Sequence, residues 1–164
     1  MWHRRAILLG LLASGLSACA SKFKTYRGPE VTRIVAQKSQ RRLYLLHHDK
    51  VLRAYNMGLG HTPQGHKQFE GDGKTPEGVY MIDRRNPNSA FHLSLGISYP
   101  NRNDWEYAHA QGKNPGGDIF IHGENGQNPH KIRDWTVGCI AVTDREIEEI
   151  YAMVRDGTQI HIVA

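Results

Sequence analysis

Apolar and polar residues alternate along several short stretches of the chain, and this pattern predicts β-strands. Two stretches rich in β-branched and aliphatic residues, 31–37 and 41–47, are separated by Lys38-Ser39-Gln40 and followed by a third at 51–57. We expect these to be antiparallel neighbours. In the later stretch 91–98, alternation places His92 and Ser94 on the same face of a strand. Further strands are predicted at 79–82, 119–121, 140–142 and 159–163.

Two other stretches have helical features. Asn103 or Asp104 is expected to cap a short helix over 105–113. Thr143 and Glu146 have the spacing of a capping box, which predicts a second helix through Val154. The chain has 164 residues and a hydrophobic fraction of 39%, enough for one compact domain. The predicted fold class is therefore mainly β with about two helices.

The first residues have the composition of an export signal. Arg4 and Arg5 precede an apolar run, 6–16, which is too short to span a membrane. The run ends in Leu16-Ser17-Ala18-Cys19, which resembles the lipobox of bacterial lipoproteins. We expect a signal peptide at 1–18, a lipidated Cys19 with a tether at 19–30, and a folded domain at 31–164. The alternative is an ordinary signal peptide cut near Ala18 or Ala20.

The charge of the chain gives little indication of a nucleic-acid partner. The formal net charge is +5, and removing Arg4 and Arg5 leaves 21 − 2 = 19 basic against 16 acidic residues, or +3. The longest basic runs are pairs such as Arg41-Arg42, whereas nucleic-acid-binding proteins usually cluster basic residues. The histidines fit no compact metal motif, so no metal and no cofactor are expected. The oligomeric state stays open.

The predicted domain contains a single cysteine, Cys139, which follows Gly138 and lies downstream of His122-Gly123. A free thiol with a pKa of about 8.5 attacks poorly at neutral pH unless a neighbouring imidazole takes its proton. Gly123 O is expected to orient that imidazole, and the Gly138 and Cys139 N–H groups to stabilise an oxyanion. The competing interpretation is a buried structural cysteine with an unrelated histidine, and the residues alone leave both open.

Three motifs resemble those of the L,D-transpeptidase catalytic-domain family, in its proteobacterial cell-wall branch. They are Ile121-His122-Gly123 with Asp134-Trp135-Thr136-Val137-Gly138-Cys139-Ile140-Ala141-Val142-Thr143, the loop Gly71-Asp72-Gly73-Lys74-Thr75-Pro76-Glu77-Gly78, and Ile97-Ser98-Tyr99-Pro100-Asn101. The resemblance implies a β-rich fold. It also implies a cysteine that attacks the diaminopimelate carbonyl of a peptidoglycan stem peptide, releases D-alanine and passes the acyl group to an amine.

By the same resemblance Cys139 is the nucleophile and His122 its base. Thr136 matches the family's Ser/Thr three residues before the cysteine. We expect Thr136, His92 and Tyr99 to contact the substrate. With Cys19 lipidated, the protein is expected in the periplasm, anchored to a membrane that we expect to be the outer one.

The chain departs from the family pattern at two positions. Val137 stands where the family commonly has histidine, and Ala141 where it often has a basic residue suited to a substrate carboxylate. Lys131, Arg133 and Arg102 are candidates to replace that basic residue, or are simply solvated charges.

Three other functions compete with transpeptidation. The same Cys–His pair with water as acceptor gives an L,D-carboxypeptidase or an amidase. A non-catalytic wall-binding lipoprotein and a metallohydrolase using His92, His122 and Cys139 are the remaining alternatives.

Overall fold

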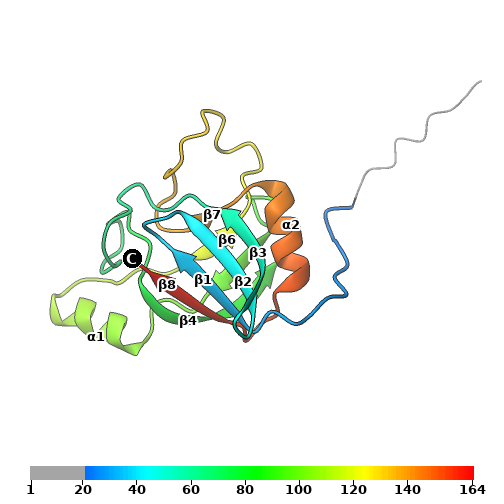
Figure 1. Cartoon of the computed structure of the whole chain (residues 1–164). Helices are drawn as coiled ribbons and strands as arrows, with labels where there is room; N and C mark the ends of the chain where they lie inside the picture. Colours follow the sequence, from blue (N-terminus) through cyan, green and yellow to red (C-terminus); the bar gives the residue numbers. More distant parts are fainter. Residues whose placement is uncertain (1–20) are drawn as a thin grey trace, which may run out of the picture.

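A computed structural model describes residues 21–164; the predicted signal peptide (1–18) and Cys19 lie outside the described residues. Within this range, eight strands form one mixed sheet in the order β3-β2-β1-β8-β4-β5-β6-β7, accompanied by two helices (Figure 1). The predicted fold class is therefore confirmed. The strands are β1 (Arg33–Gln37), β2 (Arg42–His47), β3 (Lys50–Asn56), β4 (Gly78–Asn86), β5 (Ser94–Ile97), β6 (Phe120–His122), β7 (Ile140–Ala141) and β8 (Gln159–Val163).

The first three strands form the antiparallel meander that the pattern predicts. The C-terminal strand β8 is placed between β1 and β4, parallel to the first and antiparallel to the second. Its residues Ile160 and Ile162 are buried, as expected for a central strand covered on that face. Periodicity predicts β8 but not its central place, because the period of a strand does not specify its partners.

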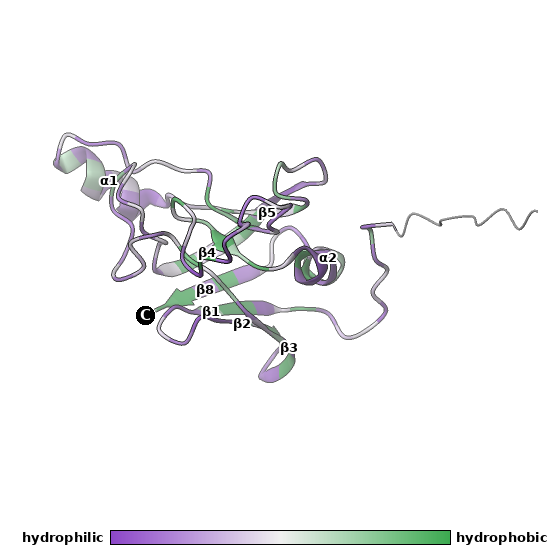
Figure 2. Ribbon diagram, turned by 90° about the horizontal axis from the view of Figure 1, so that it is seen from above, coloured by the Kyte–Doolittle hydropathy of each residue, from purple (hydrophilic) through white to green (hydrophobic). Residues whose placement is uncertain are grey.

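The sheet curls, and β4 belongs to both of its halves. One half contains β3, β2, β1 and β8, and the other contains β5, β6 and β7. Residues from Gly78 to Met81 pair with β8, and after a register shift near Ile82 the strand pairs with β5. Such irregularities bend a strand and increase its twist. Bridges from Gly58 to Ala141 and from Gly60 to Thr136 join the chain after β3 to the segment around β7. The two halves therefore stack on one another and enclose a shared core (Figure 2).

The two helices cover different parts of this sheet. Helix α1 (Arg102–Ala110) has Asn101 as its N-cap and Asp104 as the third residue of its capping box, so the predicted caps at Asn103 or Asp104 were wrong. Helix α2 (Asp144–Met153) starts after Thr143 with the predicted capping box. It buries Ile147 and Ile150 and contacts β5 and β6. Strand β7 pairs with β6, and α2 begins three residues after β7. The start of α2 therefore lies next to the end of β6.

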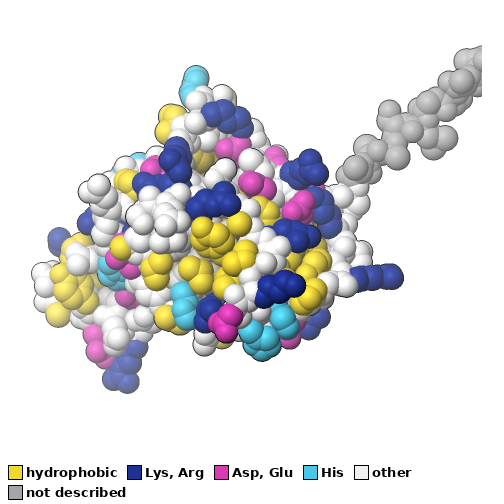
Figure 3. Space-filling view, in the orientation of Figure 1, with side chains coloured by type: hydrophobic (Ala, Val, Ile, Leu, Met, Phe, Trp, Pro, Cys, Tyr) yellow, Lys and Arg dark blue, Asp and Glu magenta, His cyan; other side chains and the backbone are white. Residues whose placement is uncertain are grey.

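Part of the segment 21–30, which was predicted to be a tether, contacts α2 before the chain continues to β1 (Figure 1). Lys24 Nζ lies 3.3 Å from a Glu148 carboxylate oxygen, and the Phe23 ring lies 6.4 Å from that of Tyr151. None of the helices of the described part is long and apolar enough to cross a membrane. On the face in Figure 3, Lys and Arg side chains are interspersed with acidic and apolar ones.

Candidate active site

The pairing of β6 with β7 brings the two dipeptides singled out in the sequence together. The strands are parallel, with His122 opposite Ala141 and Ile121 opposite Ile140. His122 ends β6 and Cys139 immediately precedes β7, so the long connection between them closes on itself. His122 and Cys139 line one pocket of about 280 Å³, which we call the His122 pocket. Its other lining residues are Asn86, Ser89, Ala90, Phe91, Ser94, Asp118 and Phe120.

The His122 side chain is buried and has a defined tautomer. Its Nδ1 lies 2.6 Å from Gly123 O, and because a carbonyl only accepts, Nδ1 carries the proton and Nε2 is left as the base. A side chain at position 123 would place its Cβ 2.5 Å from an Asp144 carboxylate oxygen, so glycine is required there. Burial lowers the pKa of His122, and the bond to Gly123 only partly opposes this, which favours the neutral imidazole.

The Cys139 thiol is also neutral at rest. Burial raises its pKa, while the Phe120 backbone N–H and the Lys67 charge oppose that rise and the Asp118 charge adds to it. Its Sγ lies 3.5 Å from Asp118 O, a contact that a protonated thiol can make as donor. The resting site therefore holds a thiol and a neutral imidazole. Attack by a neutral thiol requires a base that takes its proton, and Nε2 of His122 is the unprotonated nitrogen in the same pocket.

Thr136 and Gly138 form the turn that presents Cys139. The Thr136 hydroxyl donates to Cys139 O at 2.7 Å and accepts from Gly138 N at 3.2 Å. The Gly138 N–H thus has a partner within the turn, and its role as an oxyanion donor stays a prediction. Cys139 N–H, for which the described residues provide no acceptor, is left for that role. The Thr136 hydroxyl, predicted to contact substrate, is likewise engaged inside the turn.

Glycine at position 138 has a packing reason. Its φ of 140° is rare for residues with a side chain, and a Cβ there would lie 2.8 Å from Lys74 O. The turn is therefore held against the glycine-rich loop 71–78. This loop, singled out in the sequence for its glycines, forms a wall behind the nucleophile.

His92 and Tyr99 are not among the residues that line the pockets at Cys139. His92 precedes β5 with a φ of 75°, and its Nε2 lies 2.9 Å from a Glu148 carboxylate oxygen on α2. The predicted strand face shared by His92 and Ser94 was therefore wrong for His92, while Ser94 does line the His122 pocket. Tyr99 is buried, and its hydroxyl donates to Pro115 O at 3.1 Å. Both side chains are thus used to hold the fold in this structure.

Cys139 also lines a second pocket, of about 260 Å³, which we call the Lys67 pocket. Its lining residues are Lys67, Glu70, Gly71, Gly116, Gly117, Asp118, Ile119, Val137 and Cys139. Sequence reasoning missed Lys67 and Asp118, because neither stands in a motif with an obvious chemical role. Between residues 21 and 164, no group of three or more His, Cys, Asp or Glu side chains is placed to hold a metal ion.

Comparisons with known proteins identify the family of the chain. Residues 31–162 match the family model YkuD, described as the L,D-transpeptidase catalytic domain. A putative L,D-transpeptidase of Escherichia coli K12, YafK, is 32% identical over 102 residues, covering 61% of this chain and 34% of the relative.

Solved structures of L,D-transpeptidases and of a cell-shape protein have a similar fold. The helical cell shape determining protein Pgp2 of Campylobacter jejuni has a TM-score of 0.63 and 26% identity, covering 84% of this chain and 49% of that one. An L,D-transpeptidase of Mycobacterium smegmatis has a TM-score of 0.55 at 14% identity, covering 82% of this chain and 59% of that one, and supports the fold alone. This chain spans about a third of YafK and half of Pgp2. The family match over most of its length, together with the shared fold, shows that the chain belongs to the YkuD family of L,D-transpeptidase catalytic domains.

Proposed function

We propose that the protein is a cysteine-dependent peptidoglycan L,D-transpeptidase. The observation that carries this proposal is the shared pocket of Cys139 and His122, in which the Gly123 carbonyl fixes the imidazole proton on Nδ1. Membership of the family supports peptidoglycan as the substrate class. The similarity to a cell-shape protein, Pgp2, is consistent with action on the wall.

The proposed acylation step uses the neutral resting pair. As Sγ of Cys139 bonds to the diaminopimelate carbonyl carbon, its proton moves to Nε2 of His122. The Cys139 N–H donates to the oxyanion of the tetrahedral intermediate. The intermediate then collapses: the bond from carbon to the D-alanine nitrogen breaks, and Nε2 returns the proton to that nitrogen. A thioester and free D-alanine result.

The deacylation step reverses these roles. The acceptor amine attacks the thioester carbon and gives a proton to Nε2, and the carbon–sulfur bond breaks as the new amide forms. The departing sulfur takes the proton back from His122, which restores the neutral pair. Water in place of the amine would give a trimmed tripeptide, so the nature of the acceptor decides between transpeptidase and carboxypeptidase.

The test is to incubate stem tetrapeptides and isolated cell walls with the protein and with Cys139→Ala, and to analyse the products by mass spectrometry. New 3-3 cross-links that depend on Cys139 are the expected result. Trimmed tripeptides or released wall-linked protein would instead identify a hydrolase. No cysteine-dependent product on any substrate would exclude the enzyme and favour the wall-binding alternative.

We further propose that Cys19 carries lipid and anchors the protein at a periplasmic membrane face, on the basis of the lipobox-like Leu16-Ser17-Ala18-Cys19. Metabolic labelling of cells with an alkyne fatty acid tests this. We expect label on the protein and none on Cys19→Ala. Labelling of neither form, with a mature chain that starts near Ala20, would indicate simple secretion.

A further inference from the structure

The basic residues nominated from the sequence to bind a substrate carboxylate do not line either pocket at Cys139. Lys131 and Arg133 line a separate pocket of about 410 Å³, together with Ala141. The Arg102 side chain is 89% exposed and pairs with Glu106. A basic group at position 141 would therefore lie in that separate pocket. A cation that binds substrate next to Cys139 would therefore come from another part of the chain.

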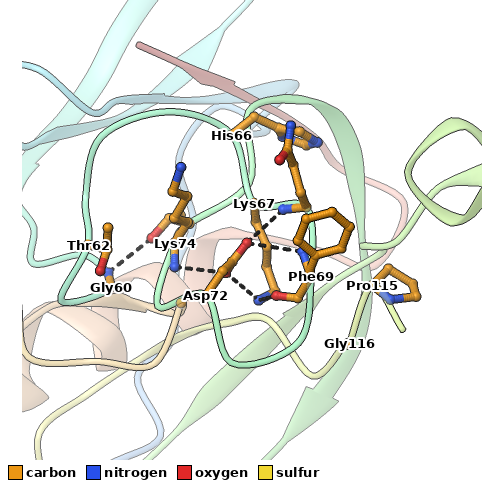
Figure 4. A network of polar contacts seen from close by, with 12 residues as sticks. Gly60, Thr62, His66, Lys67, Phe69, Asp72, Lys74, Pro115 and Gly116 are labelled. Carbon is orange, nitrogen blue, oxygen red and sulfur yellow. Dashed lines mark hydrogen bonds and ion pairs between the residues drawn. The ribbon is translucent and has the colours of Figure 1, made fainter. Parts of the chain in front are cut away.

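Lys67 is the basic residue that lines a pocket bordering Cys139. Its side chain is only 4% exposed, which is unusual for lysine and requires partners. The ammonium donates to Phe69 O at 2.9 Å and to Asp72 Oδ1 at 3.0 Å (Figure 4). These contacts use two of its three N–H donors. The described residues provide no acceptor for the third, and Lys67 is among the residues that line the pocket.

The Asp72 carboxylate is shared among several donors. Besides Lys67, it accepts from the backbone N–H groups of Gln68, Phe69 and Lys74 at 2.8 to 3.0 Å (Figure 4). Burial on its own raises the pKa of Asp72, and these donors reverse that effect, so the pKa lies below its usual value. Asp72 is thus fixed by three backbone donors, and through it the Lys67 ammonium is held in place by one ion pair.

A second buried lysine shows what a purely structural one looks like in this chain. Lys38 donates to Gly65 O, Thr75 O and Glu77 Oε1, at 2.6, 2.9 and 2.8 Å, so all three of its donors are used. It lines neither pocket at Cys139. Lys67 differs on both counts. It retains an unused donor, and it lines a pocket that Cys139 also lines.

The acidic residues of the Lys67 pocket have partners of their own. Asp118 is 91% exposed and pairs with Arg84 at 3.1 Å. Glu70 accepts from Asn114 Nδ2 at 3.1 Å. The charge of Lys67 nonetheless reaches the sulfur, since it opposes the burial that raises the pKa of Cys139. The buried part of this pocket therefore presents a cation within electrostatic reach of the nucleophile.

We propose that Lys67, held by Asp72 and Phe69, binds a carboxylate of the stem peptide beside Cys139. This inference rests on the proposed function for the identity of the ligand. A stem tetrapeptide offers carboxylates near the scissile bond from two sources: the terminal D-alanine and the free end of diaminopimelate. Both share the chemistry that a buried ammonium recognises, and the test separates them.

The test measures binding without turnover, by titration calorimetry on the full chain carrying Cys139→Ala. Three stem tetrapeptides are compared: the free acid, the form amidated at D-alanine, and the form amidated at the free end of diaminopimelate. One amide is expected to bind about 10- to 100-fold more weakly than the acid, the range for hydrogen bonds to charged groups. The amide that binds more weakly identifies the carboxylate.

Adding Lys67→Met to the Cys139→Ala protein should weaken binding of the free-acid tetrapeptide by a similar factor. The acid should then bind no more tightly than the amide that identified the carboxylate. Lys67→Gln, which keeps N–H donors for Phe69 O and Asp72, should do the same and guards against a local folding defect. Lys38→Met is the matched buried-lysine control and should leave the preference unchanged.

Equal binding of acid and amides, no binding of any form, or a preference that survives both Lys67 variants would overturn the assignment. The proposed function is tested separately, because it depends on the Cys139-dependent products of the unmodified protein: it fails if these are absent or are only those of hydrolysis.

Discussion

At the scale of single residues, the candidate site depends on where two protons lie. Gly123 O holds one proton on Nδ1 of His122, and burial keeps the other on the Cys139 sulfur. The dipeptides His122-Gly123 and Gly138-Cys139 could be singled out from the sequence because their residue types are unusual together. The N–H of Gly138 could not be assigned, because its bond to Thr136 depends on the geometry of the turn.

The raised pKa of Cys139 predicts how its alkylation depends on pH. The rate of reaction with iodoacetamide should increase with pH and level off only above the pKa of a free cysteine, about 8.5, because burial disfavours the thiolate. Peptide mass spectrometry separates Cys139 from Cys19, and a free cysteine peptide is the reference. Levelling off below about pH 7 would indicate a preformed thiolate–imidazolium pair and contradict this account.

Replacement of Gly138 by alanine tests the close packing of the nucleophile turn. The new Cβ would lie 2.8 Å from Lys74 O at a φ of 140°, so Gly138→Ala should lower the free energy of unfolding by about 1–3 kcal/mol and reduce turnover. Gly126→Ala is the control, because its φ is 72° but a Cβ there contacts nothing within 4 Å. Equal losses of stability in the two variants would show that the close approach of the new Cβ to Lys74 O does not destabilise Gly138→Ala.

At the scale of elements, the start of α2 holds the loop that follows His122, the candidate base. Asp144, the first residue of α2, accepts from Glu124 N at 2.7 Å and Asn125 N at 2.8 Å. The capping box that starts this helix was predictable, because capping depends on residues three apart in sequence. The anchoring of the loop by Asp144 was not, since it joins residues about twenty positions apart.

Two variants at this helix start should therefore behave differently. Thr143→Ala removes the N-cap and should cost about 1 kcal/mol of stability with little change in kcat. Asp144→Ala frees two backbone N–H groups next to Gly123 and should also lower kcat, by about 10- to 100-fold, because the orientation of His122 loosens. Chemical unfolding and steady-state kinetics measure both quantities. A similar fall in kcat for both variants would argue against a specific role for the loop anchor.

At the scale of the whole molecule, Asp134 joins segments that are far apart in the chain. Its carboxylate lies 2.9 Å from Arg41 Nη2 at the start of β2 and accepts from Leu59 N at 3.0 Å. Burial alone raises the pKa of Asp134, but Arg41 and the Leu59 N–H outweigh it, so the pKa is lowered in the folded protein. The lowered pKa means that the Asp134 carboxylate stabilises the folded protein at pH values above its pKa in the unfolded chain. This stabilisation is lost as the pH falls through the pKa of Asp134 in the folded protein.

This predicts acid sensitivity that depends on Asp134. The free energy of unfolding should fall between about pH 5 and pH 2, and Asp134→Asn should lower it near neutral pH by about 1–3 kcal/mol and flatten part of the acid decline. Exposed Asp156→Asn is the control. Denaturant unfolding at several pH values measures this. An unchanged decline in Asp134→Asn would show that other carboxylates, such as Asp72, account for it.

The sequence by itself determined most strands and both helices and nominated His122 and Cys139, which line one pocket, because periodicity, capping and motif spacing are local properties. It missed the start of β5 and the cap of α1, where a left-handed residue and a neighbouring asparagine override the pattern. Only the tertiary structure decided that β8 lies between β1 and β4, that His92 turns to Glu148, and that Lys67 lies beside Cys139. These facts depend on the curl and register of the sheet, which bring together residues whose separation along the chain carries no signal of contact.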